Sequence, residues 1–346
     1  MTVSLLSEAV AGDPDAFREL TEPHRRELLV HCYRMLGSLD DADDAVQETM
    51  LRAWRHLNTF EGRSSVRAWL YRIATNFCLD ALELRARRIL PDALAIPANP
   101  RRPPDPDDLE TPWLQPIPDA LLEFADTDPL ADPAVAVVRR EHIELAFVAA
   151  VQYLPPRQRA VLMLREVLGW SAAETAHILD TSPASVNSAL QRARTALSTR
   201  LPAGGAPVAS AEHAEVVARY LRAWHARDVP ALVALLREDA RMTMPPTPSW
   251  YLGRDGIGSY LSQLFSGPVG QNMRLVPTGA NLQPALAVYA AADDGHRPFA
   301  LKVLTVRDGL IAAVTGFVQP GLFARFGLPP QLPVVSRTED GSRLER

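Results

Sequence analysis

A proline-rich stretch between about residues 91 and 133 divides this chain into parts that fold separately. Acidic side chains accumulate in the same stretch, and because such a segment sustains neither a helix nor a sheet, we expect an extended linker. At 346 residues the chain is too long for one compact core, so two or three domains are expected around the linker. The apolar island Trp113–Asp119 interrupts the polar run, and we expect it to dock on a partner or on another part of the chain.

An acidic helix is expected to begin near Asp40, after the break at Gly37 and Ser38. Acids in the first turns of a helix suit the positive end of its dipole. Apolar spacing predicts the buried face, which is Val46, Met50, Ala53, Trp54 and Leu57. The residues left free for a partner are Asp44, Gln47, Glu48 and Leu51.

The helix expected after Ser65 has two different faces. One is an apolar stripe of Leu70, Ile73, Phe77 and Leu84. The other carries Trp69, Arg72 and Asn76, with arginines on both sides at Arg63, Arg67, Arg85, Arg87 and Arg88. An aromatic ring among arginines and an asparagine can stack bases, read base edges and hold phosphates. The alternative is an ordinary helical hairpin with a solvated charged surface.

Beyond the linker, helical patterns return and a helix-turn-helix is expected between residues 171 and 200. Its signals are a capping box of Ser171 and Glu174 on a helix Ala172–Leu179, a turn at Asp180 and Thr181, and a second helix opened by Ser182 and Pro183. The residues we expect at DNA are Ser182, Ser185, Asn187, Ser188, Gln191, Arg192 and Arg194. That helix holds arginines and no acid, which suits the major groove. The glycine typical of the turn is absent, and a plain helical bundle is the alternative.

Both helical parts resemble a group 4 (extracytoplasmic-function) sigma factor. The runs "DADDAVQETMLRAW" and "SSVRAWLYRIATNFCLDALELRARR" are similar to region 2, and "LPPRQRAVLMLREVLGWSAAETAHILDTSPASVNSALQRARTAL" is similar to region 4. The resemblance implies that Asp41, Asp44, Gln47, Glu48 and Leu51 bind the β′ clamp helices of core RNA polymerase. It implies that the residues named between Arg63 and Arg88 melt and read the −10 element of promoter DNA. Region 4 would bind the β flap and read the −35 element, and the acidic linker would thread the RNA exit channel rather than act as a passive spacer.

In the last third of the chain, from about residue 212, the sequence pattern changes from helical runs alone to helical runs followed by strand-like runs. Helical runs at Glu212–Ala226 and Pro230–Leu236 precede strand-like runs, which predicts an α+β sheet curled over a helix. The predicted strands are Ala240–Met244, Asn272–Pro277, Ala285–Ala291, Phe299–Val306 and Leu310–Phe317. The run "VVARYLRAWHARDVPALVALLREDARMTMPP" resembles the NTF2-like, or SnoaL-like, cone fold. Such domains extend a subset of these sigma factors, and the whole chain is most similar to the SigG-like type.

The isomerase branch of that cone family uses one tyrosine and two aspartates. By the resemblance Tyr220 falls on the tyrosine, whereas Met244 and Lys302 fall on the aspartates. A thioether cannot accept a proton, so that mechanism is lost and no catalytic residue is expected. The cone interior remains a possible apolar ligand pocket. Its expected lining is Tyr220, Met242, Met244, Trp250, Tyr289, Phe299, Lys302 and Phe317, and the alternative is that these side chains are only core.

Bulk composition excludes several classes of protein. A net charge of −5 and a pI near 5.9 argue against nonspecific coating of nucleic acid, although local basic patches remain allowed. Cys32 and Cys78 make no disulfide framework, and buried free thiols in a cytoplasmic protein are expected. Scattered histidines offer no metal site, and no cofactor is expected. We expect neither a signal peptide nor a membrane span.

The expected protein is therefore multidomain: all-α region 2 and region 4 domains joined by an extended acidic linker, followed by an α+β cone. The expected boundaries are 1–90, 91–134, 135–201 and 212–330, with a tail at 331–346. The expected function is that of a sigma factor regulated in cis by its C-terminal domain, through contact with the sigma core or the linker. A loss of activity on removing that domain is favoured, with release from inhibition as the alternative. An active isomerase or cyclase, a small-molecule sensor and a simple repressor also stay open as functions, as does the existence of an anti-sigma protein.

Overall fold

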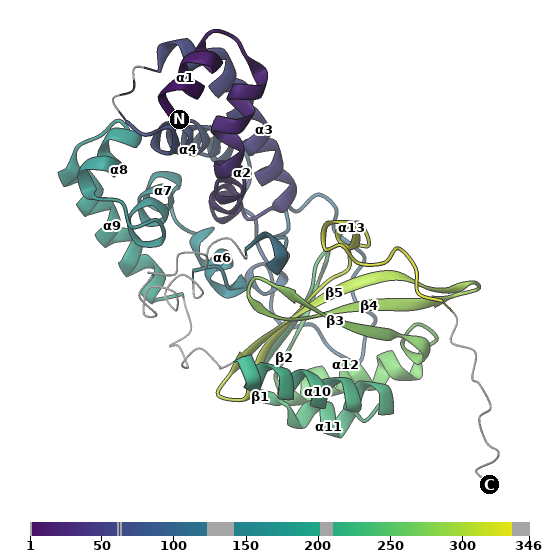
Figure 1. Cartoon of the computed structure of the whole chain (residues 1–346). Coiled ribbons are helices and arrows are strands. Elements are labelled where there is room, and N and C mark those ends of the chain that lie inside the picture. Colours follow the sequence, from purple (N-terminus) through teal and green to yellow (C-terminus); the bar gives the residue numbers. More distant parts are fainter. Residues whose placement is uncertain (1, 61, 63, 123–141, 201–209, 334–346) are drawn as a thin grey trace.

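The computed structural model describes residues 2–60, 62, 64–122, 142–200 and 210–333. Helices make up the first half (Figure 1). They are α1 (Thr2–Val10), α2 (Pro14–Leu36), α3 (Leu39–His56), α4 (Val66–Leu84), α6 (Leu145–Val151), α7 (Pro156–Leu162), α8 (Ala172–Ile178) and α9 (Pro183–Ser198). Short helical turns are η1 (Leu57–Thr59), η2 (Pro91–Ala93), η3 (Asp119–Leu121) and η5 (Met163–Val167).

The second half is a six-stranded sheet with helices. Its helical elements are α10 (Ser210–Ala226), α11 (Val229–Ala234), α12 (Gly253–Ser266), η6 (Gly270–Asn272) and α13 (Leu322–Arg325). The strands are β1 (Leu236–Met244), β2 (Thr247–Leu252), β3 (Arg274–Ala280), β4 (Gln283–Ala292), β5 (Gly295–Arg307) and β6 (Leu310–Phe317). They lie in the order β2-β1-β6-β5-β4-β3, with β1 and β6 parallel and the other pairs antiparallel.

Local signals in the sequence place the ends of the helices. Ser38 caps α3 by accepting a hydrogen bond from the Asp41 backbone N–H at 3.2 Å. Gly37, at φ +71°, ends α2, and an added Cβ there would lie 2.9 Å from Leu114 of the linker. Glycine at this position therefore provides both the left-handed turn and the space in which the linker docks.

The helix-turn-helix forms as the sequence predicts. Ser171 and Glu174 make the reciprocal capping box, and Pro183 stands at the first position of α9 after the cap Ser182. Asp180 takes the left-handed conformation at φ +49°, where many turns use glycine. The turn is thus complete without its usual glycine.

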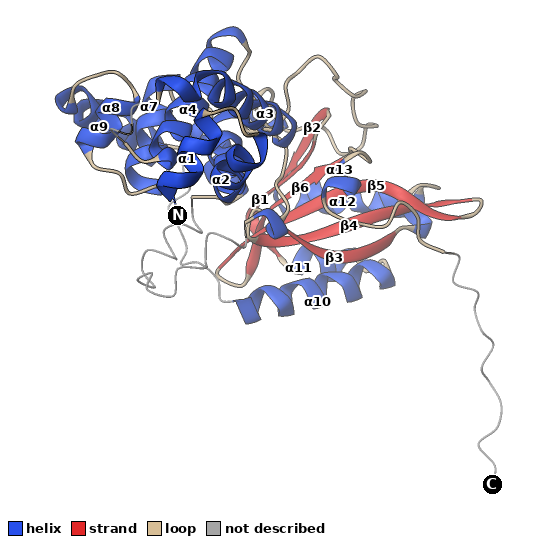
Figure 2. Cartoon of the chain, turned by 45° about the horizontal axis from the view of Figure 1, so that its top comes forward, coloured by secondary structure: helices blue, strands red, loops and turns tan. Residues whose placement is uncertain are grey.

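The sheet packs on both of its faces. Helices α10, α11 and α12 cover one face and enclose a first apolar core, while the opposite face looks toward the helical half (Figure 2). On β5 the alternation is direct: Leu304 belongs to the core under the helices, whereas Leu301 and Val303 join the cluster that continues into α2, α3, α4 and α6. The C-terminal domain and the helical half therefore share one buried apolar contact.

The observed architecture confirms the predicted fold class, with corrections in detail. Strand β2 and helix α12 were not predicted; β2 follows β1 after a turn of only two residues at Pro245–Pro246, where prolines obscure the strand pattern. Trp54, expected in the core, is 38% exposed and stacks edge-on against Phe17 of α2. The linker is docked along most of its described length, with Ala98 N–H bonded to the Trp250 carbonyl at 2.8 Å.

Candidate functional site

The acidic helix α3 presents a mixed face. Asp44 and Gln47 are exposed and Leu51 is 51% exposed, while Glu48 pairs with Arg52 of the same helix at 2.7 Å. Asp41 differs from this set because it is half-buried and paired with two arginines that follow α4. Arg85 reaches its carboxylate at 2.6 Å, and Arg88 donates to it through Nε at 2.9 Å.

Those pairs correct two expectations about free side chains. Asp41 was expected to face a partner and Arg85 and Arg88 to face DNA, yet the three hold one another in this structure. Charge complementarity explains the difference, because the arginines after α4 lie beside the first turn of α3. Their roles toward polymerase and DNA stay predictions.

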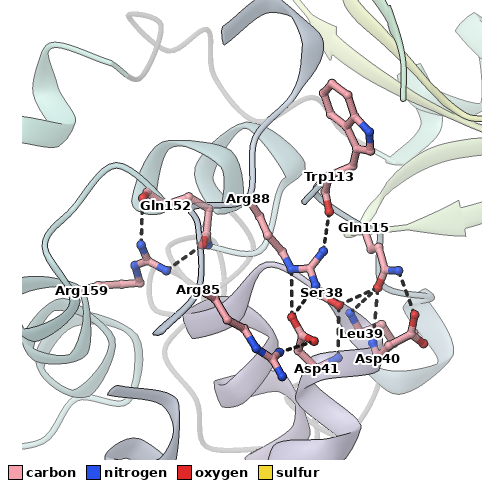
Figure 3. A network of polar contacts seen from close by, with 10 residues as sticks. All are labelled: Ser38, Leu39, Asp40, Asp41, Arg85, Arg88, Trp113, Gln115, Gln152 and Arg159. Carbon is pink, nitrogen blue, oxygen red and sulfur yellow. Dashed lines mark hydrogen bonds and ion pairs between the residues drawn. The ribbon is translucent and has the colours of Figure 1, made fainter. Parts of the chain in front are cut away.

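The linker forms hydrogen bonds with the N-terminus of α3 (Figure 3). The Gln115 side-chain oxygen accepts hydrogen bonds from Ser38 Oγ at 2.9 Å and from the Leu39 backbone N–H at 3.0 Å. Its amide group donates to Asp40 at 2.9 Å. Arg325 of α13 pairs with the next acid, Asp43. Three acids at the start of α3 therefore have partners, although Asp40 among them is exposed.

The face of α4 expected at the −10 element forms one groove. Trp69, Arg72 and Asn76 line a hollow of about 430 Å³. Its other lining residues are Arg52, His56, Thr59, Phe60, Ser64, Ile73 and His177. Phe60 lies against the Trp69 ring, with centroids 5.1 Å apart. The helical spacing of these three residues is thus reproduced as a shared surface, and His177 brings α8 to its rim.

The flanking arginines are arranged differently. Arg67 pairs with Glu27 at 2.8 Å and lies over the rings of Tyr71 and Trp170. Burial opposes ionisation of Glu27, but hydrogen bonds from His24 and Arg67 hold its pKa below the ordinary value. Arg87 lies 4.0 Å from the Tyr153 ring centre. Both arginines were expected at DNA; here they contact the half of the molecule that carries α6 to α9. Arg63 lies outside the described residues.

Helix α9 exposes its predicted polar face. Ser185, Asn187, Ser188, Gln191 and Arg192 are all exposed. A second hollow of about 580 Å³ is lined by Ser188, Gln191, Arg192, Thr195, Ala196 and Thr199. Arg192 donates to Ser188 at 2.7 Å, and Arg194 pairs with Glu166. Ser182 serves first as the helix cap. The exposed serine, amide and guanidinium groups follow one side of the helix, as a groove-reading helix requires.

The two helical units are closed on each other. Arg159 of α7 is 3% exposed and donates to the Met35 carbonyl of α2 and to Gln152 at 2.7 Å. Burial lowers the pKa of Arg159 to about 10. Trp170 packs edge-on against Tyr71 with centroids 5.1 Å apart. This contact was not predicted, since periodicity shows which face is apolar but not which helix covers it.

The tip of the β3–β4 hairpin inserts where these units meet the linker. Asn281 is fully buried, and its side-chain amide donates at 2.8 Å both to the Tyr33 hydroxyl of α2 and to the Ile143 carbonyl before α6. Its side-chain oxygen accepts from the Ile117 backbone N–H at 3.1 Å. We call Tyr33, Ile117, Ile143 and Asn281 the junction. One side chain of the C-terminal domain thereby joins α2, the linker and the segment that leads into α6.

Neighbouring contacts reinforce the junction. Asp119 accepts from the Leu282 backbone N–H at 2.7 Å, and Gln283 accepts from the Leu145 backbone N–H at 2.9 Å. An added Cβ at Gly279 would lie 2.2 Å from the Asp119 carboxylate, so any larger residue there would have to displace Asp119. The island Trp113–Asp119 therefore docks within the chain, on α3 on one side and on the hairpin on the other.

The expected ligand-pocket residues do not form one lining, which corrects that expectation. Tyr220 and Met242 lie in the core under α10 to α12, with Met244, Phe299 and Lys302 at its partly buried edge. Tyr289 and Phe317 belong to the opposite cluster. Trp250 points to the linker, donating to the Ala95 carbonyl at 2.8 Å. The cause is strand alternation, which sends residues of one strand to both faces of the sheet.

Two negative findings apply to the part of the chain that the structure describes. Among residues 2–60, 62, 64–122, 142–200 and 210–333, no helix has the length and apolar character needed to cross a membrane. The same residues contain no cluster of three or more side chains suited to holding a metal ion.

Comparison with known proteins places these features in a family. Residues 20–88 match Sigma-70 region 2, residues 144–197 match Sigma-70 region 4, and residues 217–314 match a SnoaL-like domain. The chain is 46% identical over 338 residues to the ECF RNA polymerase sigma factor SigG of Mycobacterium tuberculosis, covering 95% of this chain and 90% of that protein. It is 30% identical over 318 residues to SigJ of the same species, covering 87% and 91%.

A solved structure agrees with these matches. The crystal structure of Mycobacterium tuberculosis SigJ aligns with a TM-score of 0.58 at 26% identity, covering 90% of this chain and 98% of that one. Region 2, region 4 and the SnoaL-like domain thus follow one another along the chain in this order, both in the sequence matches and in the elements of the structure. This chain belongs to the extracytoplasmic-function RNA polymerase sigma factors.

Proposed function

We propose that this sigma factor binds core RNA polymerase in the cytoplasm through the exposed face of α3 and directs it to promoters. Asp44, Gln47, Glu48 and Leu51 would meet the β′ clamp helices, and the groove at Trp69 would take the −10 element. Helix α9 would read the −35 element, with its part of the chain against the β flap. The units 1–90, 91–134, 135–201 and 212–330 remain our proposed division of labour.

We infer further that the described arrangement is a closed, transcriptionally silent state. The −10 and −35 elements are about 25 base pairs apart, which is about 85 Å at about 3.4 Å per base pair. Trp170 and Tyr71 are in contact, so the −10 groove and α9 belong to units that touch. Helix α9 is about 24 Å long at about 1.5 Å per residue. That length is far too short to span the separation between the −10 and −35 elements. Promoter binding therefore requires the units to separate.

We propose that the C-terminal domain holds that closed state. The observation that supports this proposal most directly is the set of contacts made by Asn281. Its buried side chain bonds to the region 2 side, to the linker and to the region 4 side at once. A domain that prefers one arrangement shifts the population toward it by its differential contact energy. About 1.4 kcal/mol changes a scarce population tenfold. The contacts support inhibition, and so favour release over loss when the domain is removed.

The test is run-off transcription with purified core polymerase and a mapped promoter. Ending the chain near Gly204 is expected to raise transcription several-fold while core binding persists. Substituting Trp113, which is 4% exposed in the docked linker, is expected to reproduce part of the effect. Transcription that falls after truncation would instead support a domain that holds an active arrangement. Unchanged transcription would end the regulatory proposal.

An enzymatic role is the second candidate, and the edge of the cone argues against it. Met244 and Lys302 flank Gly316, each with its Cγ about 3.8 to 3.9 Å from where a Cβ of residue 316 would be. Neither side chain is a carboxylate, so the position offers no general base of the isomerase type. We propose that the domain is not an isomerase; turnover of a Δ5-3-ketosteroid by the full chain would contradict this.

A further inference from the structure

Lys302 is the only lysine in the sequence, since every other basic side chain among the 36 is arginine. It lies in the middle of β5, on the face that α10 covers. Its ammonium nitrogen lies 3.6 Å from the Trp224 ring centre and 6.0 Å from the Tyr220 ring centre. Within the described residues it makes no hydrogen bond or ion pair.

The surroundings of this amine are apolar but contain unused hydroxyl groups. Tyr220 and Tyr251 are 2% and 1% exposed, and neither hydroxyl has a hydrogen-bond partner in the described part of the chain. Buried hydroxyls without partners are uncommon, because each loses its hydrogen bonds to water. Met244 and Phe299 are partly buried at the edge of this core, and Lys302 itself is half-buried. Lys302 therefore belongs to the partly buried edge of this core.

The environment changes the chemistry of the amine. Burial lowers the pKa of Lys302 to about 7, because the charged form loses water and gains no carboxylate in exchange. Near neutral pH about half of the amine would be uncharged, compared with roughly one part in 2,500 for a free lysine of pKa near 10.4. An uncharged lysine amine in an apolar site is the form that attacks carbonyl carbon.

We propose that Lys302 is a covalent capture site for an apolar aldehyde or ketone. The Nζ lone pair attacks the carbonyl carbon, the carbon–oxygen double bond gives its electrons to oxygen, and a carbinolamine forms. Both amine hydrogens leave with that oxygen as water, which leaves a reversible imine, so no oxidant or reductant is needed. The carbonyl substituents would pack against Trp224 and Phe299.

Tyr220, whose ring centre lies 6.0 Å from the Lys302 nitrogen, would assist this step. Burial raises the pKa of its phenol above the ordinary value, so the hydroxyl stays protonated and can donate to the carbonyl oxygen. Nothing else in the described residues accepts its hydrogen. An arginine at position 302 would keep its charge and could not attack, which distinguishes this position from the basic residues elsewhere in the chain.

The capture site does not depend on the regulatory proposal. Lys302 faces α10, whereas its neighbours Leu301 and Val303 on the same strand face the helical half. Imine formation is read from mass and not from transcription, so either proposal can fail alone.

The experiment uses the full chain, benzaldehyde as the apolar probe and sodium cyanoborohydride to trap the imine, with intact mass and peptide mapping. The matched control is Arg297→Lys, which adds an exposed lysine on the same strand, since Arg297 is 66% exposed. At pH 7 we expect trapping at Lys302 at least tenfold faster than at the introduced lysine. The trapping rate at Lys302 is expected to reach half its maximum near pH 7.

Two further variants sharpen the result. Lys302→Met should abolish trapping within β5 while circular dichroism and thermal unfolding stay close to the parent. Tyr220→Phe should slow trapping several-fold without moving its pH midpoint. Equal rates at both lysines, or a midpoint near pH 10, would overturn the proposal. The proposal would also be overturned if decanoate protected Lys302 from trapping and raised the pH midpoint of the trapping rate. That result would indicate a site that pairs with carboxylates through its charge.

Discussion

The Asn281 side chain and the Tyr33 hydroxyl are 2.8 Å apart across 248 residues of sequence. Tyr33 also contacts the linker, since its hydroxyl donates to the Gln115 carbonyl at 2.8 Å. Gln115 in turn holds the first turn of α3, the helix proposed to bind polymerase. A hairpin of the C-terminal domain is thus connected to the proposed polymerase-binding helix through two hydrogen-bonded residues.

Asn281→Gly is the variant that isolates the hydrogen bonds of the junction. Glycine tolerates the left-handed conformation of this position, φ +58°, so only the side-chain contacts are lost. A buried group left without its partner costs about 1–3 kcal/mol, and Tyr33, Ile117 and Ile143 would each lose one. We expect run-off transcription to rise several-fold and amide exchange near residue 117 to speed up. Asn272→Ala, an exposed asparagine, is the control and should change neither.

The hairpin shows where sequence reasoning stops. Strands β3 and β4 were predicted from their apolar runs, and Asn281 stands at the turn between them, where asparagine is common. That pattern indicates a turn but not what the turn contacts. The partners Tyr33 and Ile143 lie 248 and 138 residues away, and no local periodicity encodes such a pairing.

Asp44→Lys combined with Glu48→Lys tests the proposed polymerase face. Asp44 is exposed, and Glu48 makes only a partly exposed pair with Arg52, which is worth about 0–1 kcal/mol. The fold should therefore persist while core polymerase binding is lost through charge reversal. Native gel shift with core polymerase measures the binding. Asp293→Lys with Asp294→Lys, on an exposed hairpin, is the matched control; equal binding by both double variants would remove α3 from the interface.

The DNA contacts proposed for helix α9 divide into expected phosphate contacts and expected base contacts. Arg192→Ala should weaken promoter binding for all sequences and reduce the salt dependence by about one phosphate, a slope change of about 0.9. Asn187→Ala should instead change which −35 bases are preferred. Arg222→Ala, exposed on α10, serves as the control. Binding titrations at several salt concentrations measure both effects. If all variants have the same salt dependence and the same base preference, the helix that recognises the −35 element lies elsewhere.

The residues expected at DNA illustrate a second limit of the sequence. Spacing correctly grouped Trp69, Arg72 and Asn76 into one groove, because helical geometry fixes which residues share a face. It did not show that Arg67 and Arg87 contact Trp170 and Tyr153 in the closed arrangement. A guanidinium suits a base, a phosphate or an aromatic ring equally well, so its residue type alone does not select the partner.

Arg325→Ala tests whether the C-terminal domain also covers α3, the helix proposed to bind polymerase. Arg325 on α13 pairs with Asp43 of α3, one residue before the exposed Asp44. A partly exposed pair of this kind contributes about 0–1 kcal/mol, so its loss should tighten core binding by up to about fivefold. Arg325→Glu places like charges together and should tighten binding further. Titration with core polymerase measures both, and Arg297→Ala controls for lost positive charge. Affinities that match the parent for both Arg325 variants would show that the contact does not compete with polymerase.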